Sequence, residues 1–377
     1  MCDLQLTSIP KAPGLPSVVV PSFSNPFWLR NRRRITDVRG IIERRRFDAI
    51  RARFYEELWQ RAALVTGATA QRLSNGLIQI TRGSFATFVD RSDIMLDSAI
   101  ASRLLLDKAL TYDWLAGKGL RVPRRAAFSM NSLDRAEAFL AGQAGPVVVK
   151  PADGTGCGHG VTTGITSLAG LHAASCHAAA FHPNLLVEEQ LTGSSFRLLY
   201  LDGEFIDAVR RDSPVVIGDG RSSIRQLALQ ENDRRREAAP ITALSPLMID
   251  RESRNTLAAQ GRSPAYVPDV EEVVQVKLAV NENAAGQNHV VREQVHQEII
   301  DVGRKIVRDF RIGLAGLDVT SHDIAAPVSR GDTIFNEINA GPGLHHHYLV
   351  ANPENAADVA PTILEHMFAT QRGVLTL

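Results

Sequence analysis

Two short segments near the end of the chain constrain the fold most. They are GLDVT at 316–320 and FNEINAGPG at 335–343, each with one acid among apolar or small neighbours. Both are typical of short strands, and the alternation of a strand places Glu337 and Asn339 on one face. With Asp318 they would offer the oxygen ligands that Mg²⁺ prefers when it carries nucleotide phosphates. The alternative is two edge strands with solvated acids; the Gly-Pro-Gly turn favours a site, because glycine lets backbone approach a ligand closely.

The charge balance excludes several classes of partner. The 377 residues include 42 basic and 41 acidic side chains, so no global field recruits nucleic acid or an acidic membrane. No apolar run approaches the roughly 20 residues that span a bilayer. The chain has three cysteines and no CxxC motif, which favours a reducing compartment. Its N-terminus has no charged leader followed by an apolar core, so we expect no secretory signal. We therefore expect a cytoplasmic protein.

The length predicts two or three domains. Phe47, Ile50, Phe54 and Leu58 recur at the spacing of one helix face. Nearby arginine clusters could clamp an acidic peptide, but a solvated helix face is the interpretation we favour. From about residue 98 helices and strands alternate, whereas 240–290 is polar and is expected to be irregular. We expect strands at 146–151, 184–190, 196–201 and 204–210, and helices at 98–115, 132–140, 168–181, 223–236 and 294–310.

A glycine-rich segment at 153–160 lies between two expected strands. This position argues against a dinucleotide-binding fingerprint, and no Walker motif occurs. Its backbone N–H groups could cover phosphates, or the segment could be an ordinary surface turn. Lys150 ends the apolar strand before it, so its ammonium group needs a polar partner such as phosphate, unless it snorkels to solvent. Glu188 and Glu189 end another apolar strand, where one of them could contact adenine or ribose.

Three consecutive histidines, residues 345–347, follow the Gly-Pro-Gly turn. Adjacent histidines cannot easily all point at one ion, so we do not favour a zinc site. A polar wall that faces the substrate is the preferred interpretation. The chain has no GxSxG motif and no cysteine in a recognisable nucleophile setting, which leaves covalent catalysis unsupported.

Six segments, in this order, resemble the ATP-grasp superfamily of carboxylate–amine ligases, in particular the ATP-grasp part of cyanophycin synthetases and bifunctional glutathione synthetases. The segments are DKALT at 107–111, VVKP at 148–151 with the following Asp153-Gly154, LVEE at 186–189, Arg210-Arg211 with VIGDGR at 216–221, GLDV at 316–319 and NEINAGPG at 336–343. The resemblance implies an α+β fold in which two α+β subdomains enclose ATP. These would be a lid subdomain with the glycine-rich loop at 98–191 and a subdomain with the Mg²⁺ site at 192–377. Residues 1–97 would form a smaller N-terminal α/β domain.

The resemblance also implies roles for individual residues. Asp318, Glu337 and Asn339 would hold Mg²⁺, expected as two ions. The ATP site would comprise Lys108 and Lys150 on the phosphates, the loop residues Asp153, Gly154, Gly156 and Gly158, and Glu188, Glu189 and Leu191 around adenine. Arg210, Lys277 and Asn281 would face the phosphoryl-transfer site. One departure concerns ribose, because Ser194-Ser195 stands where relatives carry an acid.

The implied function is an ATP-dependent ligase that joins an amino acid or peptide carboxylate to an amine through an acyl phosphate and releases ADP. The alternatives are an ATP-grasp kinase or carboxylase, and a non-catalytic nucleotide-binding module; the last ranks lowest because all three metal ligands are present. The expected partners are amino acids or short peptides, with no nucleic acid and no membrane, and a homodimer is left open. We expect the amine to enter near 343–347, where the histidines could orient it or accept its proton.

Overall fold

The fold is built around a five-stranded antiparallel sheet. A computed structural model describes residues 38–153 and 160–377 of the chain. The sheet has the order β13-β10-β9-β14-β15. Its strands are β9 (Ser194–Leu201), β10 (Glu204–Arg211), β13 (Asn288–Val290), β14 (Leu314–Ser321) and β15 (Ile334–Ala340). The expected hairpin is confirmed: β9 and β10 meet at Asp202 and Gly203, which both have the positive φ that such a two-residue turn requires.

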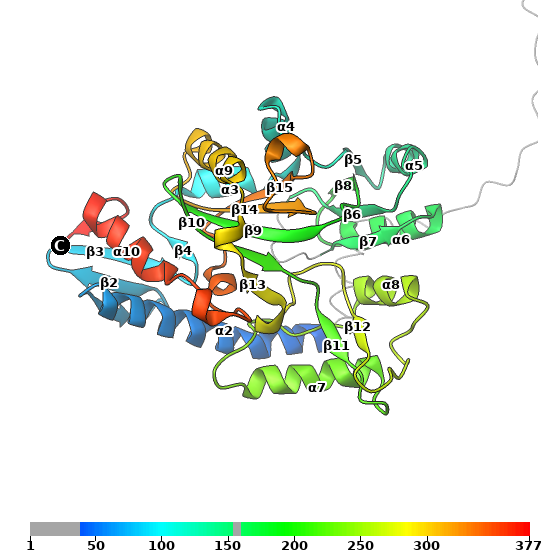
Figure 1. The fold of residues 1–377 in the computed structure, drawn as a ribbon, viewed down its shortest axis with the longest axis horizontal. Helices are drawn as coiled ribbons and strands as arrows, with labels where there is room; N and C mark the ends of the chain where they lie inside the picture. The colour runs from blue at the N-terminus through cyan, green and yellow to red at the C-terminus, as the bar shows by residue number, and fades with distance from the viewer. Residues whose placement is uncertain (1–37, 154–159) are drawn as a thin grey trace, which may run out of the picture.

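The two faces of this sheet pack against different helices. Alternate residues such as Leu198 and Tyr200 belong to one cluster, with α9 (Gln297–Phe310) and parts of α3 (Ala99–Leu105) and α4 (Lys108–Gly117). Leu199 and Leu201 belong to a second cluster with α2 (Val38–Val65) and α10 (Val359–Thr370). Figure 1 shows α3, α4 and α9 on one side of the sheet and α2 on the other.

A second antiparallel sheet has a core of its own. Its order is β5-β8-β6-β7, from β5 (Arg125–Ser129), β6 (Val147–Pro151), β7 (Thr162–Ile165) and β8 (Asn184–Glu189). The helices α5 (Leu133–Ala141) and α6 (Leu168–Ala179) bury their apolar residues against Val147, Val149 and Val187. This unit lies within the stretch 98–191 that the sequence assigned to a lid subdomain (Figure 1).

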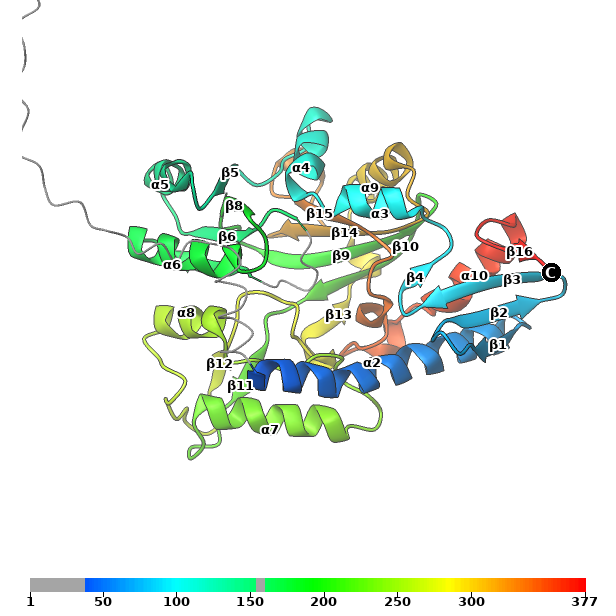
Figure 2. The same cartoon turned by 180° about the vertical axis from the view of Figure 1, so that it is seen from behind.

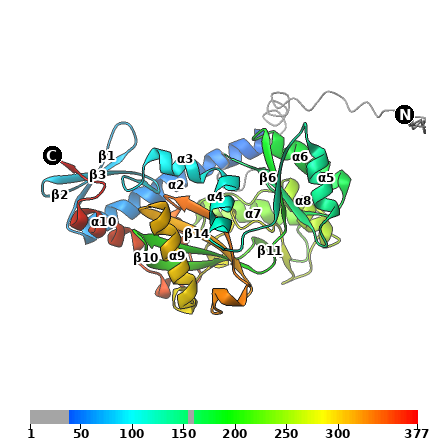
Figure 3. The same cartoon turned by 90° about the horizontal axis from the view of Figure 1, so that it is seen from above.

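The N-terminal elements pack against the C-terminal ones. The strands β1 (Thr69–Arg72), β2 (Ile78–Arg82), β3 (Phe85–Asp90) and β4 (Asp93–Ile94) form a sheet that β16 (Leu375–Thr376) completes by pairing with β3. Figure 3 shows β2, β3 and α10 at one end of the molecule. The expected helix face is confirmed in α2, where Phe47 and Leu58 are buried. Trp59 of α2 shares a core cluster with Ile363 of α10, so the boundary expected at residue 97 does not separate two hydrophobic cores.

The segment between β10 and β13 forms a small unit with its own core. It contains β11 (Val215–Ile217), α7 (Ile224–Glu237), α8 (Arg251–Ala259), β12 (Val273–Gln275) and the 3-10 turn η2 (Ala285–Gln287). The expectation that 240–290 is irregular is therefore wrong for α8, β12 and β13. The helix α8 was missed because its buried face includes Glu252, Ser253 and Thr256, which hide the apolar periodicity. Figure 2 shows α7 beside α2, where Arg236 forms an ion pair with Glu43.

None of the described helices is both long enough and apolar enough to cross a membrane.

Candidate active site

A row of charged side chains crosses three strands of the central sheet. Asp318 on β14 lies directly opposite Glu337 on β15, and Arg197 on β9 lies opposite Asp318. Side chains at directly opposite positions of antiparallel strands project from the same face. Asn339, two residues after Glu337, shares this face and lies opposite Gly316. The two segments that carry the predicted metal ligands are thus adjacent in the sheet.

Asp318 is held in its ionised form by arginines. The Nε and Nη2 atoms of Arg197 donate to its two carboxylate oxygens, each at 2.6 Å, and Nη1 of Arg211 lies 3.8 Å away. Burial alone would raise the pKa of Asp318, but the positive groups around it, Arg197 foremost, together outweigh burial and hold that pKa below its usual value. Arg211 and Lys108 act in the same direction. The carboxylate is therefore negative at neutral pH, with both of its oxygens hydrogen-bonded to Arg197.

Lys108 reaches this row from the start of α4. The carboxylate of Asp107 caps the helix by accepting a hydrogen bond from the backbone N–H of Leu110. The cap fixes the first turn over β15, and Nζ of Lys108 lies 2.8 Å from Oε1 of Glu337. The structure therefore brings a predicted phosphate lysine into contact with a predicted metal ligand.

Lys150 lies on the second sheet, in a buried cluster of three polar groups. Its Nζ atom is 2.8 Å from Oε2 of Glu188 on β8 and donates to the hydroxyl of Tyr112 at 3.0 Å. The Lys150 side chain is largely buried, so this lysine does not snorkel to solvent. Oε1 of Glu188 is buried and, within the described residues, has no hydrogen-bond partner. An unused buried acceptor is costly, and an amino group of a bound ligand could satisfy it.

The remaining residues of the predicted ATP site have mixed surroundings. Glu189 accepts hydrogen bonds from the backbone N–H and the Nε of Arg124, at 2.9 and 2.7 Å. Leu191 and Asp153 are half-buried. Gly154, Gly156 and Gly158 lie outside the described residues. The ATP roles of all these residues stay predictions.

The structure corrects the position of the predicted arginine. Arg211 lies opposite Ser195 on β9, so its side chain is on the same face of the sheet as that of Arg197. Arg210 lies opposite Phe196, which belongs to the hydrophobic cluster that packs against α9. Arg210 therefore points to the other face, where it forms a two-point ion pair with Asp212 at 3.0 Å. The sequence predicted Arg210 at the transfer site, but the structure places Arg211 beside Asp318.

Lys277 is enclosed in a cluster of charged side chains in the small unit between β10 and β13. It is 1% exposed, and its Nζ lies 2.7 Å from Asp250 and 2.8 Å from Glu282. Burial alone would lower the pKa of Lys277, but the surrounding carboxylates, Glu282 first, raise it above its usual value. Asn281 lines a small cavity together with His345 and His346. The structure thus brings Asn281, but not the ammonium group of Lys277, to the histidines, and both catalytic roles stay predictions.

The three histidines have three different partners. A Cβ at Gly316 would lie 2.6 Å from Pro342, so the Gly-Pro-Gly turn crosses directly over β14 and carries the histidines onto this face. Nδ1 of His345 is 3.0 Å from the hydroxyl of Tyr55, and the ring of His346 stacks on that of His345. His347 is fully buried, with Nδ1 2.8 Å from a carboxylate oxygen of Asp207.

Four residues at this site were not found from the sequence. Arg197 had a signal, because it is the only charge in the apolar strand segment FRLLYL at 196–201. Arg211 was named only as a neighbour of Arg210. Tyr112 directly follows the DKALT segment in α4, but no role was assigned to it, and Tyr55 lies in α2, which carries no motif.

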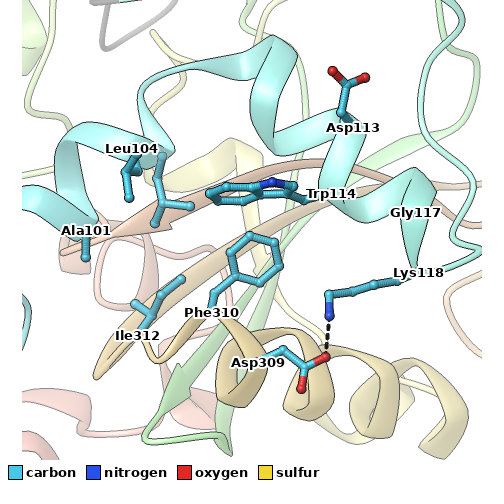
Figure 4. A pocket seen from close by; sticks show the side chains of 10 residues that line it. Ala101, Leu104, Asp113, Trp114, Gly117, Lys118, Asp309, Phe310 and Ile312 are labelled. Atoms are coloured by element: carbon cyan, nitrogen blue, oxygen red, sulfur yellow. Dashed lines mark hydrogen bonds and ion pairs between the residues drawn. The ribbon is translucent and has the colours of Figure 1, made fainter.

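A separate groove lies between α4 and α9 and contains none of the predicted site residues. Its volume is about 500 Å³, and Figure 4 shows the ring of Trp114 close to that of Phe310, with Lys118 paired to Asp309 at one edge. The groove is on the α9 side of the central sheet, away from the row of Asp318 and Glu337.

Replacing Lys150 with alanine should weaken ATP binding. The change removes one positive charge from the phosphates, and a hydrogen bond to a charged group is worth about 1.5–3 kcal/mol, so the dissociation constant should rise by at least about tenfold. Calorimetric titration with a non-hydrolysable ATP analogue measures this dissociation constant. Lys118→Ala, at the separate groove, is the control and should leave the constant unchanged. An unaltered affinity in the Lys150 variant would show that this lysine has only a structural role.

Comparison with solved structures decides the fold. The bifunctional glutathione synthetase of Pasteurella multocida superposes on 83% of this chain and 43% of its own, with a TM-score of 0.50 and 20% sequence identity. The chain has the ATP-grasp fold. The α+β fold class predicted from the sequence is thereby confirmed. No protein-family model matches this ATP-grasp chain.

Curated sequences similar to the ATP-grasp chain agree with this fold. The cyanophycin synthetase of Trichormus variabilis is 28% identical over 292 residues, which cover 76% of this chain and 31% of the relative. The glutathione biosynthesis bifunctional protein of Clostridium perfringens is 24% identical over 288 residues, or 75% and 37% of the two chains. The predicted resemblance to ATP-grasp ligases is confirmed. The chain spans about a third of the length of these relatives.

Proposed function

We propose that this chain is an ATP-dependent carboxylate–amine ligase that forms an amide bond through an acyl phosphate and releases ADP. The observation that carries the proposal is the contact between Lys108 and Glu337, at 2.8 Å, beside the ionised Asp318. A cation from one helix and two carboxylates from two paired strands then face the same small volume. Such an arrangement is suited to phosphoryl transfer, which depends mainly on positioning and electrostatics.

The donor set supports a magnesium ion at this row. Asp318, Glu337 and Asn339 offer carboxylate and amide oxygens, and these hard donors suit Mg²⁺ better than a softer metal. The bound ion would neutralise charge on the ATP phosphates. Two ions, as the resemblance implies, are part of the proposal.

The side chains of the site account for the two chemical steps. A carboxylate is a poor electrophile, so its oxygen first attacks the γ-phosphorus of ATP, and ADP leaves. Lys108 and Lys150 would hold the phosphates during this transfer, while Arg211 and Arg197 offer positive charge beside the moving group. An amine then attacks the acyl carbon, loses a proton and displaces phosphate, which yields the amide. The substrates we propose are amino acids or short peptides.

A screen of ADP release tests the reaction class. Amino acids and short peptides are supplied singly and in pairs, with ATP and Mg²⁺, and ADP is measured in a coupled assay. The proposal predicts rapid release only when an acid and an amine are both present, with an amide as product. Full turnover with one acceptor, and a stable phosphorylated product, would instead identify a kinase.

A further inference from the structure

The helix α2 contributes a side chain to the histidine wall, by which we mean the three residues His345, His346 and His347. Tyr55 is 3% exposed, and its hydroxyl lies 3.0 Å from Nδ1 of His345, a residue 290 positions further along the chain. Backbone groups of His345 and Leu344 and the side chain of Ser92 also lie near the Tyr55 oxygen, where they partly oppose the rise that burial causes in its pKa. Tyr55 therefore joins α2, the β3–β4 turn and the segment after β15 at one point.

The buried phenolic proton of Tyr55 needs an acceptor, because an unpaired buried O–H group is costly. A backbone N–H group can only donate, so the backbone N–H groups of Leu344 and His345 cannot accept this proton. The hydrogen bond of the hydroxyl joins it to Nδ1 of His345, at 3.0 Å, and an unprotonated Nδ1 can accept the proton. A neutral imidazole that accepts at Nδ1 carries its own proton on Nε2.

Both rings are neutral at neutral pH. Burial raises the pKa of Tyr55 to about 12, so the phenol keeps its proton. Burial, with the nearby cations Arg211 and Arg197, lowers the pKa of His345 to about 3. His345 therefore presents a neutral N–H donor at Nε2 rather than an imidazolium or a free base.

The surroundings of His345 favour an anionic partner. Arg211, Arg197 and Arg51 are close enough to act on the ring electrostatically. Arg51 comes from α2, one turn before Tyr55, and is fixed by donating to the backbone oxygen of Leu244 at 2.9 Å. Asp318 neutralises part of this charge through its pair with Arg197, and the remaining positive charge of the arginines favours a carboxylate over a protonated amine.

We propose that Tyr55 is a positioning residue that holds His345 as the Nε2–H tautomer, so that His345 donates a hydrogen bond to a carboxylate oxygen of the acid substrate. The inference rests on the proposed ligase function and names the substrate that this wall contacts. It replaces the expectation that the amine enters here, because an Nε2–H tautomer cannot accept a proton from the amine at that nitrogen.

Nitrogen NMR of the full chain, labelled with ¹⁵N-histidine, tests the tautomer directly. The spectrum of wild type should show His345 with a protonated Nε2 and an unprotonated Nδ1, assigned by the loss of these signals in His345→Gln. Tyr55→Phe should shift the Nδ1 signal, because that nitrogen loses its donor. Tyr200→Phe, which removes a buried hydroxyl on the α9 side of the sheet, should leave both signals in place. An Nδ1–H tautomer in wild type, or an unchanged Nδ1 signal in Tyr55→Phe, would overturn the inference.

Kinetics test the role of His345 in recognising the acid. His345→Leu should raise KM for the acid substrate by at least about tenfold, as expected for the loss of a hydrogen bond to a charged group. His345→Gln, which keeps an N–H donor near the Nε2 position, should recover most of this loss, and neither variant should alter KM for the amine. A rise in the amine KM alone would overturn the inference and place the amine at this wall.

A carboxylate probe separates this inference from the proposed function. Sodium acetate should shift the Nε2–H signal of His345 in wild type, and methylammonium chloride at the same concentration should not. A response to methylammonium but not to acetate would overturn the inference even if the chain ligates acids and amines. A response to acetate, in a chain that releases ADP with a single acceptor, would support the inference and count against the ligase.

Discussion

Replacing Glu337 with alanine should lower ADP release by at least about a hundredfold at saturating ATP and substrates. The carboxylate is the proposed metal ligand that also contacts Lys108, and no other described acid on β15 can replace it. Metal stabilisation of phosphoryl charge is worth several kcal/mol, and each 1.4 kcal/mol is tenfold in rate. The coupled ADP assay measures the effect across a range of Mg²⁺ concentrations.

The control for this variant is Glu354→Ala. Glu354 is an exposed acid in the turn before α10, and its loss should leave the rate within about twofold of wild type. Thermal unfolding of both variants checks that the chain stays folded, because Glu337→Ala also leaves Lys108 without its carboxylate. A near wild-type rate for Glu337→Ala at saturating Mg²⁺ would remove this residue from the site.

Adjacent arginines should differ sharply in their effects on turnover. Arg211→Gln should lower kcat by at least about tenfold, because it removes a charged donor beside the proposed phosphoryl-transfer site. Arg210→Gln should change kcat by less than about twofold, because it disrupts only a half-exposed ion pair with Asp212. Each substitution therefore serves as the matched control for the other. Equal losses, or a larger loss for Arg210→Gln, would contradict the assignment of Arg211 to the site face.

The sequence predicted those parts of the site that depend on local pattern. Alternation within 335–339 placed Glu337 and Asn339 on one face, and the apolar strand before the glycine-rich segment placed Lys150 at a buried strand end. The hairpin at Asp202-Gly203 was predicted from turn chemistry alone. Each of these predictions needs only a few consecutive residues.

Contacts between distant segments could not be predicted in this way. Whether Arg210 or Arg211 faces Asp318 depends on the pairing of β10 with β9, because a shift of one residue reverses every side chain. The pairing of β16 with β3 and the contact of Tyr55 with His345 each join residues hundreds of positions apart. The helix α8 was hidden by its buried polar residues, of which Glu252 accepts a hydrogen bond from the backbone N–H of Ala279, 27 positions further along the chain.

The most direct measurement of the central claim is trapping of the acyl phosphate with hydroxylamine. The chain is incubated with ATP, Mg²⁺ and each candidate acid, without amine, and hydroxylamine is added as a small nucleophile. The account predicts a hydroxamate of one acid, formed in step with ADP, and its loss in Glu337→Ala but not in Glu354→Ala. ADP formation from acid plus amine, with no hydroxamate from any acid, would contradict an acyl phosphate open to an external nucleophile.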